Sequence, residues 1–177
     1  MRILIDINVV LDFLQEREPF VENAAILFER IDTGDIEGFI AATTITNIYY
    51  IVRRAAGKVV AQDAITQVLS DLNICTVDLE VLEQALALNF QDFEDAVQYV
   101  CAVMHNVDAI VTRDPSGFVK AEIPVILPEE LDTISRGERR NQSNILYSRR
   151  GVLPRSHHHD YLRDRLEALQ YMRSRLA

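Results

Sequence analysis

The sequence lacks any apolar run approaching the roughly 20 residues that a membrane-spanning helix needs. Its start, MRILIDINVV, also lacks the separate basic region and the small-residue cleavage site of a secretory signal. Together these absences predict a cytoplasmic protein that does not insert into a membrane.

Cysteine is scarce as well. The two cysteines, Cys75 and Cys101, lie in the apolar segments NICTV and YVCAV, and neither has a cysteine or histidine at metal-ligand spacing. The pattern predicts two buried, reduced thiols and offers no coherent set of soft metal ligands.

Lysine is almost absent, and the charges are unevenly divided along the chain. Lys58 and Lys120 are the two lysines. Residues 1–135 carry 8 lysines and arginines against 23 acids, a net charge of −15, whereas residues 136–177 carry 10 against 4, a net charge of +6. An acidic domain repels polyanions unless a cation intervenes. The basic tail is therefore expected to fold back on the domain or to reach a polyanion.

What is present fits one compact domain followed by a tail. The chain has 177 residues, 49% of them hydrophobic and 25% charged, which suits a single substantial core. Apolar β-rich runs predict strands at 2–5, 38–42, 73–77, 109–112 and 123–127. Helical spacing predicts helices at 8–15, 19–33, 44–57, 62–72, 79–88 and 92–105, with a closing turn at 128–134.

Strands separated by helices, rather than by tight hairpin turns, indicate a mostly parallel sheet covered on both faces. We therefore expect a three-layer α/β/α domain over residues 1–135 and a helical tail over 136–177. Thr43 and Thr44 are candidate caps of the third helix. In the helix at 92–105, the expected buried stripe is Phe93, Ala96, Val97, Val100, Val103 and Met104.

Two aspartates follow predicted strands. Asp6 comes directly after the strand at 2–5, and Asp114 follows the strand at 109–112 by two residues. Sites in parallel sheets form beyond the carboxyl ends of the strands, so both side chains belong at one edge if these strands are parallel neighbours. The structural alternatives are that Asp6 simply ends a strand and that Asp114, before Pro115, begins a turn.

Asp92 and Asp95 lie in the first turn of a predicted helix, where helix capping explains either one taken alone. The whole set favours a site. Carboxylates about 4 Å apart repel by roughly 4 kcal/mol at the effective dielectric of protein sites. Convergence of Asp6, Asp95 and Asp114 would therefore require either protonation or a cation, and carboxylate oxygens suit Mg²⁺ or Mn²⁺.

Three segments in order, RILIDINVVLD, QDFEDAVQYVCAVMHNVDAIVTRD and the SGF that follows, resemble the PIN domain family, notably its VapC-like bacterial branch. The resemblance covers about residues 1–130. It implies a Mg²⁺- or Mn²⁺-dependent ribonuclease that hydrolyses single-stranded RNA, in which metal ions activate water and stabilise the departing oxygen. It places the catalytic and metal-binding acids at Asp6, Asp95 and Asp114, with Asp92 as an auxiliary metal ligand.

The same resemblance suggests polar partners for these acids. Asn8 and Thr112 are similar to residues that flank the family's site and orient carboxylates or bound water. Arg113 is a candidate contact for an RNA phosphate. Three further candidates, which an exposed charged helix end explains equally well, are Arg53, Arg54 and Lys58.

Asn47 is the one clear departure from the family pattern. The segment TTITNIYYIV presents Asn47 where active PIN nucleases usually present a glutamate. A neutral amide leaves one less negative charge, so the site should hold its metal less tightly. Two alternatives follow: a degenerate PIN domain that binds RNA or a protein without cleavage, and, for Asn47 itself, a polar side chain that merely faces solvent.

Two other families match less well. DINVV is similar to the D-x-D motif of haloacid dehalogenase phosphohydrolases, but Asn8 occupies the third position and the second catalytic acid is missing. A response-regulator receiver would need an acid pair where Asp6 stands alone, although Asp78 follows the third strand.

The tail begins with the polar, basic stretches ERRNQSN and YSRRG, which indicate a linker. It ends in a helical stripe of Leu162, Leu166, Leu169 and Met172. We expect this stripe to pack or to make a contact within a homo-oligomer. By analogy with VapC-type toxins, which bind a helical antitoxin, it could fill a neighbouring subunit's groove. The consecutive His157, His158 and His159 cannot aim at one ion together, and no site is assigned to them.

Overall fold

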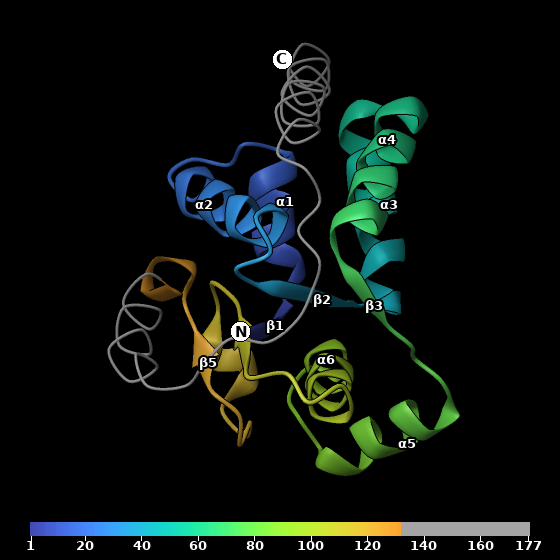
Figure 1. The fold of residues 1–177 in the computed structure, drawn as a ribbon. Coiled ribbons are helices and arrows are strands. Elements are labelled where there is room, and N and C mark those ends of the chain that lie inside the picture. The colour runs from blue at the N-terminus through green and yellow to red at the C-terminus, as the bar shows by residue number, and fades with distance from the viewer. Residues whose placement is uncertain (132–177) are drawn as a thin grey trace, which may run out of the picture. The chain divides into compact units, whose positions relative to one another are not determined.

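The computed structural model describes residues 1–131, which form a compact unit. The predicted boundary at 135 and the tail at 136–177, with its stripe and its histidines, lie outside the described residues. Within residues 1–131, five strands form one sheet in the order β3-β2-β1-β4-β5, and every neighbouring pair is parallel (Figure 1). The strands are β1 (Arg2–Ile5), β2 (Glu37–Ala41), β3 (Asn73–Cys75), β4 (Ala109–Val111) and β5 (Val125–Ile126). The predicted parallel α/β architecture is confirmed.

Six α-helices and two 3₁₀ turns connect these strands in the described part of the chain. They are α1 (Ile7–Leu14), α2 (Val21–Asp32), α3 (Ala42–Ala56), α4 (Lys58–Asp71), α5 (Leu79–Leu88), α6 (Phe93–Met104), η1 (Pro115–Phe118) and η2 (Pro128–Glu130). Asp6, Asp78 and Asp92 cap α1, α5 and α6 by accepting backbone N–H groups. Gly57 separates α3 from α4 at a φ of +88°, a conformation that favours glycine. The helices within residues 1–131 are too short or too polar to span a membrane.

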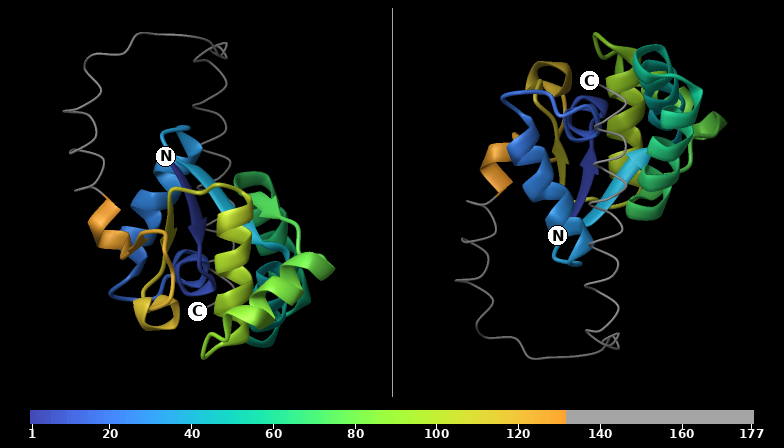
Figure 2. Two further views of the ribbon diagram at one scale, coloured as in Figure 1. Left: turned by 90° about the horizontal axis from the view of Figure 1, so that it is seen from below. Right: turned by 90° about the horizontal axis from the view of Figure 1, so that it is seen from above.

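Helices cover both faces of the sheet. Figure 1 shows α1 and α2 on one side of the strands and α5 and α6 on the other, and the two views of Figure 2 keep α2 and α6 apart in the same way. The face toward α5 and α6 contributes Leu4, Phe39, Ala41, Cys75 and Ile110 to one apolar cluster. Cys101 of α6 belongs to the same cluster, and both cysteines are free and buried, as the sequence predicts.

The two central strands bring the predicted site together at one edge. β1 and β4 are parallel neighbours, with Ile5 opposite Val111, and the backbone N–H of Asp6 donates to the Val111 carbonyl at 3.0 Å. The chain therefore leaves both strands at the same carboxyl edge of the sheet. This confirms the expectation that Asp6 and the segment 112–114 follow parallel neighbours.

The expected caps of α3 are wrong. The helix begins at Ala42 with Ala41 as its N-cap residue, and no side chain accepts a hydrogen bond there. Thr43 and Thr44 lie inside the first turn, and Thr44 is fully buried. The reason is that β2 continues to Ala41 and passes directly into the helix, so no loop residue remains to serve as a cap.

Half of the stripe expected on α6 is also wrong. Phe93, Val103 and Met104 are 50%, 46% and 41% exposed, whereas the three members in the middle of the helix are buried. The additional buried residues are Gln98, Tyr99, Cys101 and Ala102. Because α6 packs against the sheet on one side and α5 on another, its middle is enclosed nearly all round and its ends emerge into solvent.

Gly38 of β2 lies close to the side chains of Leu72 and Ile31. A Cβ at this position would lie 2.6 Å from Leu72 Cδ2 and 3.0 Å from Ile31 Cδ1. Gly38→Val should therefore lower the free energy of unfolding by ~1–3 kcal/mol, because the added methyl groups overpack the layer between β2 and α2. Urea denaturation checks this, and an unchanged midpoint would show that Leu72 and Ile31 move aside without cost.

Candidate active site

Asp6 is the best-anchored acid at the carboxyl edge of the sheet. It follows β1, caps α1 and is 5% exposed. Its Oδ1 accepts hydrogen bonds from the Ile7 backbone N–H at 2.6 Å and from Gln98 Nε2 at 3.1 Å. Its Oδ2 accepts from Asn8 Nδ2 at 2.6 Å and from the Thr112 hydroxyl at 2.7 Å. Four donors from three elements hold this carboxylate in one orientation.

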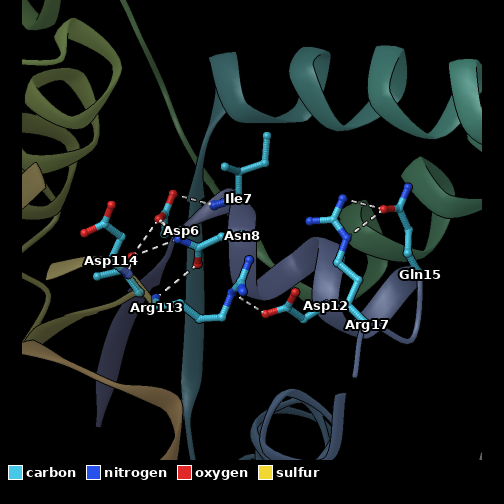
Figure 3. A network of polar contacts seen from close by, with 9 residues as sticks. Asp6, Ile7, Asn8, Asp12, Gln15, Arg17, Arg113 and Asp114 are labelled. Atoms are coloured by element: carbon cyan, nitrogen blue, oxygen red, sulfur yellow. Dashed lines mark hydrogen bonds and ion pairs between the residues drawn. The ribbon is translucent and has the colours of Figure 1, made fainter. Parts of the chain in front are cut away.

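Thr112 and Asn8 connect Asp6 to the end of β4. The Thr112 Oγ1 accepts hydrogen bonds from Asn8 Nδ2 and from the backbone N–H of Asp114, each at 3.0 Å. The Asn8 Oδ1 accepts the backbone N–H of Arg113 at 3.2 Å. Figure 3 shows Asn8 between Asp6 and Arg113. The network joins the start of α1 to residues 112–114.

Asp114 lies at the exposed rim of this network. Its Oδ1 accepts the backbone N–H of Ser116 at 3.1 Å and also the Ser116 hydroxyl, so it caps the η1 turn. These hydrogen bonds hold the pKa of the Asp114 carboxyl below its usual range. The turn-starting role considered for Asp114 is therefore present.

Asp95 is the predicted site residue whose pKa its surroundings raise. It lies in the first turn of α6, half-buried. Burial, and then the nearby negative charges, raise the pKa of Asp95 to about 6. The charges that contribute are those of Asp6, Asp92, Glu94 and Asp114. The predicted acids thus lie close enough to Asp95 to act on it electrostatically.

Gly117 packs directly on Asp95. A Cβ at Gly117 would lie 2.1 Å from Asp95 Oδ2 and 2.8 Å from its Cγ. The η1 turn that Asp114 caps can approach α6 this closely because the residue has no side chain. Gly117 therefore couples the position of η1 to the Asp95 carboxyl.

The first turn of α6 carries two further contacts. Asp92 Oδ1 accepts the backbone N–H of Glu94 at 2.7 Å, so the capping role considered for Asp92 is present. Asn47 Nδ2 of α3 donates to Glu94 Oε1 at 2.9 Å. Asn47 is only partly exposed, and the interpretation of it as a side chain that merely faces solvent is wrong.

Arg113 is engaged on the other side of the network. Its Nε lies 2.7 Å from Oδ2 of Asp12, which is 1% exposed, and its guanidinium lies 4.1 Å from the ring centroid of Phe20. Burial raises the pKa of Asp12, and the charges of Arg113 and Arg17 oppose that rise. Figure 3 shows the Arg113 side chain extending toward Asp12 rather than toward Asp6 and Asp114. The other candidate phosphate contacts, Arg53, Arg54 and Lys58, are exposed.

Several residues of this arrangement were not foreseen from the sequence. Gln98 lies one turn beyond Asp95 on α6, and that spacing is the signal that could have identified it. Gly117 lies within the SGF that follows the last acid. Glu94 and Asp12 had no such signal, because their partners Asn47 and Arg113 are distant in sequence.

The donor set fits a hard divalent cation in its chemistry. The acids around Asp95 offer only oxygen, and their mutual repulsion is what a cation would relieve. Within residues 1–131, however, no three His, Cys, Asp or Glu side chains are grouped so that they could hold a metal ion. Binding would therefore require exposed acids such as Asp92 and Asp114 to turn toward Asp95.

The Thr112 hydroxyl provides a first test of the network. Thr112→Val keeps the shape but removes the donor to Asp6 and the acceptor for Asn8 and Asp114, so we expect the free energy of unfolding to fall by about 1–3 kcal/mol. Thr112→Ser keeps the hydroxyl and is the matched control. Urea denaturation checks this, and a loss in Thr112→Val that does not exceed the loss in Thr112→Ser would contradict the expected role of the hydroxyl.

The raised pKa of Asp95 predicts how stability depends on pH. In the unfolded chain this carboxyl titrates near 3.9, whereas in the folded protein its pKa is about 6. The folded state thus binds the proton more tightly, and stability falls as the pH rises through this interval. In EDTA, Asp95→Asn should raise the free energy of unfolding by about 1 kcal/mol near pH 8 and little near pH 4, since solvent screens a partly exposed carboxyl. Equal effects at both pH values would contradict the raised pKa.

Several known proteins are similar to this chain in sequence or in fold. Ribonuclease VapC1 of Aquifex aeolicus is 27% identical over 134 residues, which cover 73% of this chain and 92% of that protein. VapC20 of Mycobacterium tuberculosis, described as a toxin that cleaves the sarcin-ricin loop, superposes with a TM-score of 0.56 at 12% identity and covers 67% of this chain and 94% of its own. VapBC2 of Rickettsia felis, solved with a promoter DNA fragment, gives 0.55 at 14% identity, with coverages of 72% and 98%.

These two structural likenesses show the fold alone, at such low identity. The sequence model of the PIN domain matches residues 2–116, a range that includes Asp6, Asp95 and Asp114. The chain therefore belongs to the PIN domain family.

Proposed function

We propose that this PIN domain is a metal-dependent endoribonuclease that hydrolyses phosphodiester bonds of single-stranded RNA. The observation that carries the proposal is the buried Asp6 carboxylate, held by four donors, beside an Asp95 carboxyl whose pKa its acidic neighbours raise. That a relative of 27% identity is named a ribonuclease supports the same activity.

The residues would divide the work as follows. Asp6, Asp95 and Asp114 would hold Mg²⁺ or Mn²⁺, with Asp92 as an auxiliary ligand. The ion, when bound, supplies the charge that activates water and neutralises the scissile phosphate. Asn8 and Thr112 keep the Asp6 carboxylate in place through the hydrogen bonds described above.

RNA binding needs cations that this acidic domain has in small number. Arg53, Arg54 and Lys58 are exposed at the junction of α3 and α4 and can reach phosphates. Arg113 stays a predicted phosphate contact, but its ion pair with Asp12 would have to open or be shared. We expect weak intrinsic affinity for RNA and a strong dependence on the bound cation.

We further propose that the protein acts as the toxin of a toxin–antitoxin pair in the cytoplasm. Its structural neighbours include VapBC2 and a toxin–antitoxin complex from Klebsiella pneumoniae, the latter with a TM-score of 0.54 at 21% identity. Co-purification with the product of an adjacent small gene would support an antitoxin partner. A homo-oligomer, in which the tail at 136–177 takes part, stays a prediction.

A second function follows from the neutral amide of Asn47. With one acid fewer on α3, the domain could bind RNA or a protein without cleaving it. Fluorescence anisotropy with labelled single-stranded RNA separates the two functions, because RNA that is bound and stays intact in Mn²⁺ would favour the non-cleaving domain.

Asp6→Asn tests the nuclease proposal directly. With Mn²⁺ and single-stranded RNA, we expect this change to lower the cleavage rate at least about 100-fold, because it removes a charged ligand from the site. Asp63→Asn is the matched control, since Asp63 is an exposed acid of α4 and should leave the rate unchanged. Cleavage that survives in Asp6→Asn, or that persists in EDTA, would overturn the proposal.

A further inference from the structure

Glu94 lies beside Asp95 in the chain, and the expected site gives it no role. It follows the N-cap Asp92 by two residues and is only partly exposed. Its Oε1 accepts the side-chain amide of Asn47 at 2.9 Å, which ties the start of α6 to the middle of α3. A long side chain is thereby held in one place on the side of α6 that faces α3.

The position of this carboxylate relative to the site follows from the helix. Glu94 directly precedes Asp95 in the first turn of α6. It lies one turn before Gln98, whose side-chain amide contacts Asp6. A favourable interaction with the helix dipole explains an acid in the first turn of α6, but it does not explain the hydrogen bond from Asn47.

Gln98 supplies an independent sign that a polar ligand belongs here. It lies one turn after Glu94 on α6, it is 1% exposed, and its Nε2 donates to Asp6 at 3.1 Å. Its Oε1 is buried and has no hydrogen-bond partner within residues 1–131. The same amide that contacts Asp6 thus has a buried oxygen without a donor, and a water molecule bound to a cation would supply one.

We propose that Glu94, held by Asn47, is the fourth acid of the site and takes the part that a glutamate on α3 would otherwise play. This inference rests on the proposed function, because it assumes that the site binds a divalent cation. An amide at position 47 is then a positioning residue: Asn47 donates one hydrogen bond and leaves the second oxygen of Glu94 for the ion. Glu94 on α6 thereby supplies the negative charge that Asn47 on α3 lacks.

Calorimetric titration of the metal-free full chain with Mn²⁺ alone tests the proposal without any RNA. Glu94→Gln should weaken Mn²⁺ binding by ~10- to 100-fold, since it keeps the shape and removes the charge. The double variant Asn47→Glu with Glu94→Gln should recover most of the affinity, because the acid is moved across the same contact. Thermal unfolding in EDTA verifies that each variant folds.

Glu80→Gln is the matched control. Glu80 also lies in the first turn of a helix, α5, and also accepts one side-chain amide, from Gln84 at 3.1 Å. Its loss should leave Mn²⁺ affinity unchanged, because it is not among the charges that act on Asp95.

The outcomes separate this inference from the proposed function. Mn²⁺ binding that is the same in the wild type and in Glu94→Gln would overturn the role of Glu94 and leave the nuclease proposal standing. Failure of the double variant to recover affinity, with a normal fold, would overturn the exchange between positions 47 and 94. A wild-type chain that binds no Mn²⁺ would overturn both the inference and the metal-dependent activity.

Discussion

The hydrogen bond from the Thr112 hydroxyl to the buried Asp6 carboxylate is the contact on which the rest of the site depends. It spans the ends of β1 and β4, the two central strands of a parallel sheet. Parallel pairing already brings these ends to one edge, and the hydroxyl then fixes the side chains that leave it. Because Thr112 also accepts the backbone N–H of Asp114, the same atom determines where the chain turns toward η1.

Charge repulsion is the constraint that this scaffold has to contain. Asp95 lies among several carboxylates in a domain that is strongly acidic overall, and its raised pKa reflects that crowding. The surrounding structure restrains the acids with uncharged donors, namely the amides of Asn8 and Gln98 at Asp6 and of Asn47 at Glu94. Such donors orient carboxylates without neutralising them, so the negative charges remain and still favour a bound cation.

Arg113 is a cation close to this network, but its charge is used elsewhere. Arg113 directly precedes Asp114, yet its guanidinium pairs with the buried Asp12 and lies over Phe20. An unpaired Asp12 in that position would be costly, so the ion pair is more readily understood as the anchor of residues 112–114 on α1. An arginine that stayed among the acids would compete with a metal for the same oxygens.

Much of the architecture was predictable because it depends on local patterns. Apolar runs ending in Asp6 and near Asp114 indicated strands, and their alternation with helical segments indicated a parallel sheet. The capping of α5 by Asp78 and of α6 by Asp92 follows from residue types that accept backbone N–H groups. The caps of α3 were not predictable in this way, since they depend on where β2 ends.

The sequence by itself determined the order of strands and helices, the acids at the strand ends and the departure at Asn47, because each of these is a property of neighbouring residues. Only the tertiary structure decided which side chains meet. Asn47 reaches Glu94, Gln98 reaches Asp6 and Gly117 reaches Asp95 across separations that no periodicity encodes. The physical reason is that the packing of helices on the sheet, rather than spacing along the chain, sets the distances over which charges and hydrogen bonds act.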